Sequence, residues 1–130
     1  MSVVSINKGV RISPRKVGVV AALVRGRSVE DAMTILEHTP RRAALAVKKT
    51  VRSAQANAEH NHNYKPNTLV ISEISVTPGP RFKRFRAAAR GRANKYQHKT
   101  SHIRVVVDGE IRVTKKPAAK VEKVENEETK

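Results

Sequence analysis

The hydrophobic positions of the first half of the chain follow helical spacing. From Ser13 to about Asn61, apolar residues recur at intervals of three and four, which is typical of amphipathic helices. Ser13-Pro14 predicts the start of the first helix, because serine is a favoured N-cap and proline a favoured first helical residue. Its predicted buried face consists of Val17, Val20, Ala21 and Val24.

Two further helices are predicted from the same spacing. Ser28 caps the second, with Asp31 three residues later as an approximate capping box, and this helix ends before Pro40. The third and longer helix is predicted from Thr39-Pro40 to about Asn61. Its apolar stripe is formed by Ala44, Val47, Val51, Ala54 and Ala58.

Three other segments show the alternation of apolar and polar residues that predicts β-strands. The first runs from Val3 to Ile12, with Val4 and Ile6 on one phase. The second runs from Leu69 to Val76, and its residues on one phase are Val70, Ile74 and Val76. The third runs from Ser101 to Val113, and its alternating apolar residues are Ile103, Val105 and Val107.

The charge is concentrated between the second and third strands. The 34 residues from Ile74 to Val107 contain no acidic side chain and nine lysines and arginines, and the whole chain has a net charge of +16. Such an element is stable only beside a polyanion, and a long, non-repetitive element flanked by strands favours folded RNA. Its cations are Arg81, Lys83, Arg84, Arg86, Arg90, Arg92, Lys95, Lys99 and Arg104.

This basic segment is predicted to be a hairpin that folds back near Ala87–Gly91. Its large apolar side chains, Phe82, Phe85 and Tyr96, are too few for a core of their own and suit stacking on bases. Because an isolated two-stranded ribbon is marginal in water, we expect an arm that is mobile in the free protein and orders on its partner.

Cations on the helices predict a second RNA-binding surface, although any single one of them could simply be solubilising. Those around the first helix are Arg11, Arg15, Lys16, Arg25 and Arg27. Those on the third helix are Arg41, Lys48, Lys49 and Arg52. His102 is expected either to donate a hydrogen bond to RNA or to lie on the surface of the sheet.

Other functional classes find little support in the sequence. The chain has no cysteine, so disulfides and thiolate metal sites are excluded. His60 and His62 are too few for a metal site, and no phosphate loop, nucleophile elbow or zinc motif is present. No apolar run approaches the roughly 20 residues of a membrane span. We expect no enzyme, no cofactor, no metal and no membrane insertion.

Several segments together resemble one protein family. They are Ser13–Val17, Leu23–Gly26, Val47–Val51, Ser53–Asn61, Gly79-Pro80, Lys83-Arg84, Arg90–Ala93 and Lys99–Val107. Over roughly residues 5–113 the chain resembles the L-twenty-two family of large-subunit ribosomal proteins in its bacterial form. The most specific part is the basic-Gly-Arg segment followed at this spacing by Thr100-Ser101-His102-Ile103.

The resemblance implies an α+β fold with three helices packed on a small three-stranded antiparallel sheet and a long protruding β-hairpin. Residues 1–113 would form one domain, with the hairpin at about 77–102. Residues 114–130 lie outside the resemblance, and their composition, rich in alanine, lysine, glutamate and proline, predicts a disordered tail. The partners would be 23S-type rRNA, neighbouring large-subunit proteins and the nascent polypeptide, with no homo-oligomer. The protein would assist assembly and act on the cytoplasmic ribosome.

The resemblance also implies that the hairpin lines the nascent-polypeptide exit tunnel and that hairpin changes affect macrolide antibiotics. The matching tip residues are Phe82, Lys83, Arg84, Phe85, Ala88, Arg90, Gly91 and Arg92. Ala88 departs from the family, which usually has arginine or histidine there.

Two other classes remain open on charge alone. A general DNA-binding protein is permitted, because basic β-arms occur in architectural DNA binders. The absence of a clear proline or aliphatic wedge at the tip weakens that alternative. A membrane-active peptide would need an element with a large apolar face, which the arm lacks.

Overall fold

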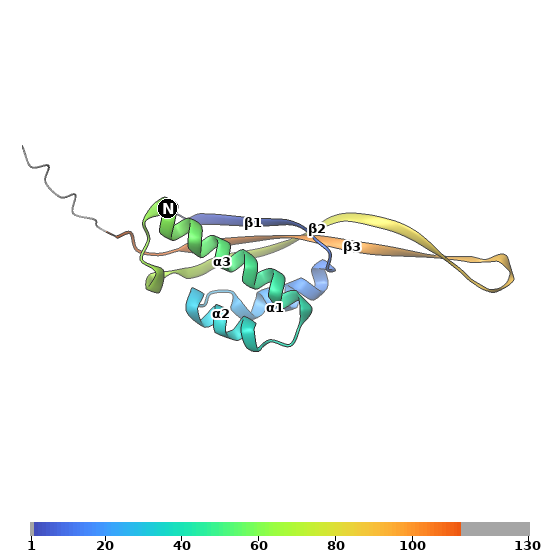
Figure 1. Cartoon of the computed structure of the whole chain (residues 1–130), viewed down its shortest axis with the longest axis horizontal. Helices are drawn as coiled ribbons and strands as arrows, with labels where there is room; N and C mark the ends of the chain where they lie inside the picture. The colour runs from blue at the N-terminus through green and yellow to red at the C-terminus, as the bar shows by residue number, and fades with distance from the viewer. Residues whose placement is uncertain (1, 113–130) are drawn as a thin grey trace, which may run out of the picture.

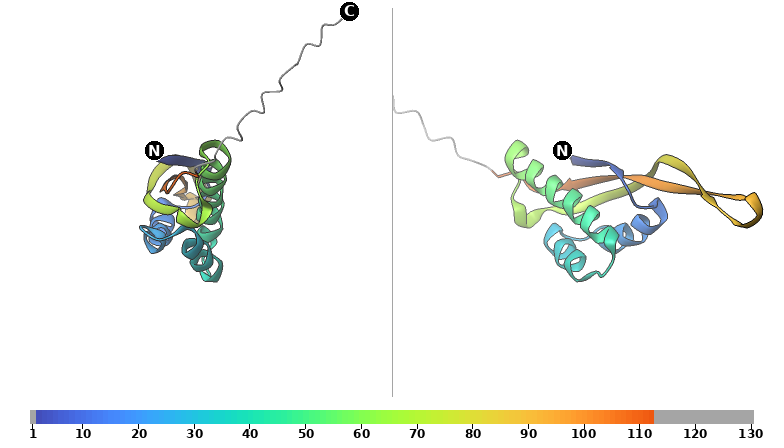
Figure 2. Two further views of the ribbon diagram at one scale, coloured as in Figure 1. Left: turned by 90° about the vertical axis from the view of Figure 1, so that its left-hand side faces the viewer. Right: turned by 45° about the vertical axis from the view of Figure 1, so that its right-hand side comes forward.

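A computed structural model describes residues 2–112, and the predicted disordered tail therefore lies outside the described residues. A small globular base carries a long two-stranded arm that extends beyond all three helices (Figures 1 and 2). The elements in chain order are β1 (Val3–Val10), α1 (Pro14–Val24), α2 (Val29–His38), α3 (Arg42–His62), β2 (Val70–Ala87) and β3 (Ala93–Asp108), with short 3-10 turns at Pro66–Thr68 and Ala89–Gly91.

The sheet has the strand order β1-β3-β2, and both neighbouring pairs are antiparallel. The three helices cover one face of this sheet (Figure 1). The predicted α+β class is confirmed. β1 pairs with β3 only as far as Ser101, whereas β2 and β3 continue together to Ala87 and Ala93. The arm, in which only β2 and β3 pair, therefore begins where β1 ends.

The first two helices form where the sequence predicts them. α1 begins at Pro14 after Ser13 and buries the four predicted residues. In α2, the Ser28 hydroxyl oxygen accepts a hydrogen bond from the Asp31 amide at 3.1 Å, which confirms the cap. These signals are local, because caps and the helical period depend on residues within one or two turns.

The start of α3 differs from the prediction. Thr39 is the C-cap of α2, and its hydroxyl donates to the Ile35 carbonyl at 2.6 Å. The residue before a proline is biased away from helical backbone, and Thr39 is extended. Arg41, which follows Pro40, is extended as well and is the N-cap, so α3 begins at Arg42. The predicted apolar stripe is correct, since all five of its residues are buried.

The predicted alternation of β1 is correct, but the face that Val4 and Ile6 share is not the one that packs on the core. Val4 and Ile6 do share a face, but they are 37% and 54% exposed, whereas Val3 and Ser5 face the helices and are buried. The buried face of β1 is thus partly polar. A strand whose two faces are both partly apolar cannot be oriented from its own alternation.

The predicted phase of β2 is correct for Ile74 and Val76, which both pack on the core, and wrong for Val70. Ile71 and Ile74 are both buried, and Val70 is exposed. The pairing with β3 shifts between Ile71 and Glu73, so Ser72 occupies a bulge, where its hydroxyl donates to the Val106 carbonyl at 3.2 Å. One extra residue in a strand reverses the phase of everything beyond it.

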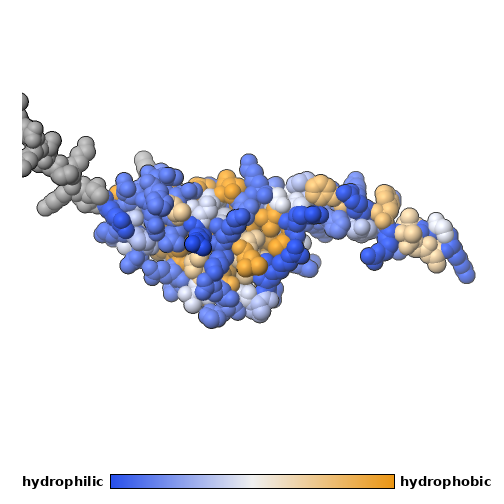
Figure 3. Space-filling model, in the orientation of Figure 1, coloured by the Kyte–Doolittle hydropathy of each residue, from blue (hydrophilic) through white to orange (hydrophobic). Residues whose placement is uncertain are grey.

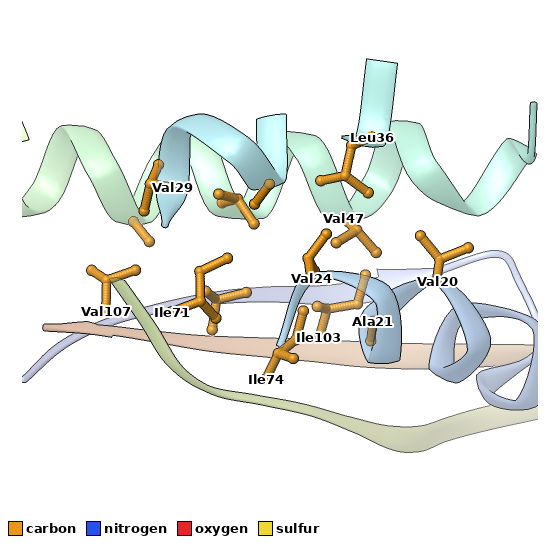
Figure 4. Packing of buried hydrophobic residues seen from close by; sticks show 14 of the residues in the cluster. Val20, Ala21, Val24, Val29, Leu36, Val47, Ile71, Ile74, Ile103 and Val107 are labelled. Atoms are coloured by element: carbon orange, nitrogen blue, oxygen red, sulfur yellow. The ribbon is translucent and has the colours of Figure 1, made fainter. Parts of the chain in front are cut away.

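The core lies between the sheet and the helices (Figure 4). Val20 and Val24 of α1 and Val47 of α3 are fully buried and face Ile103 and Ile74 of the sheet. Alanines on the buried stripe of α3 let this long helix approach its neighbours closely. This apolar layer gives the arm a rigid base.

Candidate nucleic-acid interface

The arm is a regular ribbon whose register assigns each side chain to one of two faces. The cross-strand pairs of the arm run from Arg81 with Lys99 to Ala87 with Ala93. Because side chains alternate along a strand and cross-strand partners share a face, residues 81, 83 and 85 lie on one side with residues 95, 97 and 99. At about 3.3 Å per residue, the paired part of the arm is roughly 20 Å long from Arg81 to Ala87, where the turn begins.

One face of the arm is cationic. We define this cationic face by Arg81, Lys83, Phe85, Lys95, Gln97 and Lys99. No acidic residue occurs in the arm, and all six of these residues are exposed. Like charges this close repel one another, so this face is suited to a run of phosphates.

The other face combines three aromatic rings with two arginines. We define this aromatic face by Phe82, Arg84, Arg86, Asn94, Tyr96 and His98. The rings of Tyr96 and His98 meet edge to face, with centroids 5.3 Å apart and an angle of 82° between their planes. Phe82 and Tyr96 are 44% and 42% exposed, so their ring faces are available to a base. Phe85 is separated from them on the cationic face.

The tip is a tight turn whose geometry explains Gly91. Arg90 and Gly91 both have positive φ, of 56° and 70°. Two consecutive residues of this kind are typical of type I′ hairpin turns, in which glycine is unstrained. The Ala88 amide donates to the Arg92 carbonyl at 2.8 Å and closes the turn. The predicted fold-back near residues 87–91 is confirmed.

The root of the arm is held by close contacts around His102. The Gly9 amide donates to His102 Nδ1 at 3.0 Å, which links β1 to β3 at a bulge of β1. Only the Nε2 position can then carry the ring proton of a neutral His102. The buried Thr100 hydroxyl donates to the Pro80 carbonyl at 2.7 Å. His102 thus has a structural contact at the root of the arm.

Replacing Gly79 by alanine should destabilise the protein by about 1–3 kcal/mol, as overpacking usually does. A Cβ atom at Gly79 would lie 2.5 Å from the Thr100 hydroxyl oxygen, which is fixed by its hydrogen bond. Denaturant unfolding of Gly79→Ala against the parent protein measures the loss.

The control is Gly18→Ala in the middle of α1, where a Cβ meets nothing within 4 Å. This change should raise stability by about 0.5–1 kcal/mol, because alanine is the better helix former. Equal stability of Gly79→Ala and the parent would show that the residues around Gly79 can move to accept the added methyl group without loss of stability.

Several predicted cations of the base are engaged within the protein. Arg25 donates to the Ile74 carbonyl and Arg27 to the Leu23 carbonyl, each at 3.0 Å. The Lys48 ammonium pairs with Glu37 of α2, and this contact lowers the pKa of the Glu37 carboxyl. These residues join helices to their neighbours, so their charge is partly used inside the fold.

The remaining predicted cations of the base have no such contacts. Within residues 2–112, no hydrogen bond or ion pair joins the side chains of Arg11, Arg15, Lys16, Lys49 and Arg52 to another group. Arg11 lies at the junction of base and arm, since it lines hollows shared with Thr100, Lys99 and Phe82. A basic surface therefore continues from α1 to the arm.

The sequence analysis placed Arg41 on the cationic surface of the third helix but did not single out Arg42. Both line a cavity with Arg11 and Lys16 where α1 and α3 begin. A sequence signal for them exists. Cations in a first helical turn oppose the positive end of the helix dipole, so their presence at the start of α3 indicates an anionic partner.

Figure 3 shows one face of the molecule, coloured by the hydropathy of each residue. Hydrophilic side chains cover much of the base and alternate with more apolar ones along the arm to its tip. Among the described residues, none of the helices is long and apolar enough to cross a bilayer. Nor do residues 2–112 contain three metal-ligating side chains grouped for an ion.

The comparisons with known proteins agree with this geometry. The profile of the family described as "Ribosomal protein L22p/L17e" matches residues 5–108. The "Large ribosomal subunit protein uL22" of Desulforamulus reducens is 50% identical over 107 residues, which cover 82% of this chain and 95% of that relative. The resemblance stated from the sequence is confirmed: the chain belongs to the ribosomal protein L22p/L17e family and is a structural protein of the large ribosomal subunit.

Proposed function

We propose that the protein binds 23S-type rRNA through both its base and its arm, assists assembly of the subunit, and lines the nascent-polypeptide exit tunnel with the hairpin. The observation that carries the proposal is the acid-free arm, which projects from a rigid base and carries cations on both faces, with Phe82, Tyr96 and His98 gathered on one of them. Neighbouring large-subunit proteins and the nascent chain are the further proposed partners.

In this proposal the base positions the protein on the rRNA. Its core is continuous, and its unpaired cations, such as Lys16 and Arg52, are exposed on helices that pack on this core. A preformed surface loses little conformational entropy when it meets RNA. Contacts of this kind orient the protein, and the arm then enters between RNA segments and neutralises their mutual repulsion.

In the same proposal the arm contacts RNA segments that lie beyond the base. Phosphates of one RNA segment would meet the cationic face, while bases of another would stack on the aromatic face. The tip, with Ala88, Ala89 and Gly91, presents small side chains beside Arg90 and Arg92. A narrow tip of this kind suits the wall of a passage that must stay open to a moving peptide.

Single cysteines offer a direct test, because the chain contains none. Ala89→Cys places a thiol at the exposed tip, and Ala56→Cys places one on the exposed side of α3. Each variant is expressed in cells, and large subunits are isolated by sedimentation at low magnesium after a high-salt wash. Ribosomes stalled on a defined peptide are then treated with a short thiol-reactive crosslinker.

We expect both variants to sediment with the large subunit, and only Ala89→Cys to crosslink to the nascent peptide. Release of the proteins by the salt wash would contradict integral binding to rRNA. Crosslinking of the peptide to Ala56→Cys, or to neither variant, would contradict the assignment of the arm to the tunnel wall.

A further inference from the structure

A cavity of about 470 Å³ lies where α1 and α3 begin, on the side from which the arm leaves the base (Figure 1). Its volume falls within the roughly 300–1,000 Å³ of pockets that hold small molecules. Four cationic side chains line it, namely Arg11, Lys16, Arg41 and Arg42. No acidic residue is part of its wall.

The four cations are not neutralised within the protein. The described ion pairs join Lys48 to Glu37, Lys65 to Glu110 and Arg104 to Glu73, and none of them includes a residue of the cavity. Four positive charges that converge on one small volume repel one another. A bound anion relieves this repulsion, and low local polarity on part of the wall strengthens the attraction.

The backbone adds to the same preference. Neither Ser13 nor Arg41, the N-caps of α1 and α3, bonds to a first-turn amide through its side chain, and neither first turn contains an acid. By contrast α2, which begins elsewhere, has a serine cap and two acids in its first turn. Pro14 has no N–H, and the amides of Lys16 and Ala44 bond to the carbonyls of Ser13 and Arg41. The positive ends of the two helices and the other amides of their first turns remain available to an anion.

The cavity is also larger and more apolar than a phosphate requires. Ile12, which is half-buried, and Ala43, which is only 4% exposed, form part of its wall. Hydrocarbon contributes nothing to phosphate binding, but it packs well against the flat face of a base. Arginine planes beside such a wall are the other surface on which unstacked bases of RNA are held.

We propose that this cavity receives one rRNA nucleotide turned out of its helix, with the phosphate at the cations and the base against Ile12 and Ala43. The inference rests on the proposed rRNA binding and specifies one of its sites. It identifies Arg41 and Arg42 as contacts to a single nucleotide, distinct from the run of phosphates along the arm.

The test uses the full chain, labelled for NMR and titrated separately with adenosine monophosphate, ribose 5-phosphate and inorganic phosphate at constant ionic strength. We expect adenosine monophosphate to bind most tightly and to shift the methyl signals of Ile12 and Ala43. The Arg41→Ala/Arg42→Ala variant should weaken this binding by about tenfold or more. The matched control, Lys49→Ala/Arg52→Ala, removes the same charge from α3. Because neither residue lines the cavity, this variant should keep the parent's affinity for adenosine monophosphate.

An equal response to all three compounds would overturn the nucleotide site, as would unchanged binding in the Arg41→Ala/Arg42→Ala variant. Binding of the same protein to deproteinised 23S rRNA is measured in parallel. If rRNA binds while adenosine monophosphate leaves the cavity signals unmoved, the inference fails and the proposed function stands. If the chain does not bind rRNA at all, the proposed function fails and the inference fails with it.

Discussion

Removing the charge of the cationic face should lower both the affinity for rRNA and the dependence of that affinity on salt. The variant replaces Arg81, Lys83, Lys95 and Lys99 by alanine. Each cation that neutralises a phosphate releases counterions, and each contact contributes about 0.7–0.9 to the slope of log affinity against log salt. Four lost contacts should therefore reduce the slope by about 3. Filter binding to deproteinised 23S rRNA over a series of KCl concentrations measures it.

The aromatic face provides the matched comparison. Phe82→Leu/Tyr96→Leu removes two exposed rings and no charge. Stacking of a base on an aromatic side chain contributes about 1–3 kcal/mol, and it does not release counterions. This variant should bind more weakly at every salt concentration while its slope stays the same. Equal slopes for the parent and the charge variant would show that the cationic face does not contact phosphates.

Helices of this protein could be predicted closely because their signals are local. Ser13-Pro14 and the cap at Ser28 mark helix starts within a few residues, and the buried face of α1 follows from spacing alone. The hairpin and its fold-back near Ala87–Gly91 could also be predicted, since strand patterns flank the segment. Only the start of α3 was displaced, because the residues on both sides of Pro40 are extended.

The orientation of the edge strands could not be predicted, because it depends on long-range pairing. The bulge at Ser72 is defined by the pairing of β2 with β3. The buried face of β1 contains Ser5 rather than Ile6. The same holds for the candidate site. Residue types in the arm indicate RNA, but the division into two faces requires the register of Arg81 with Lys99, and the cavity joins Lys16 to Arg42 from two helices.

Truncating Ile103 to alanine should destabilise the free protein by about 2–5 kcal/mol, a large share of the 5–15 kcal/mol typical of a domain. Ile103 is fully buried on β3, the central strand, and pairs with neighbours on both sides. Its removal leaves a cavity between the sheet and the helices that the surrounding core cannot fill completely. Urea unfolding followed by circular dichroism measures the free energy of unfolding.

The control for this prediction is Leu45→Ala on α3, where the leucine is 73% exposed and its loss should cost almost nothing. A small effect of Ile103→Ala would mean that the base lacks the rigid core on which the proposed function depends. Binding to rRNA should partly restore the variant, because a ligand that binds only the folded state stabilises it by mass action. If Ile103→Ala has a low free energy of unfolding as free protein but stays folded in the large subunit, then rRNA binding and the core together stabilise the base that carries the arm.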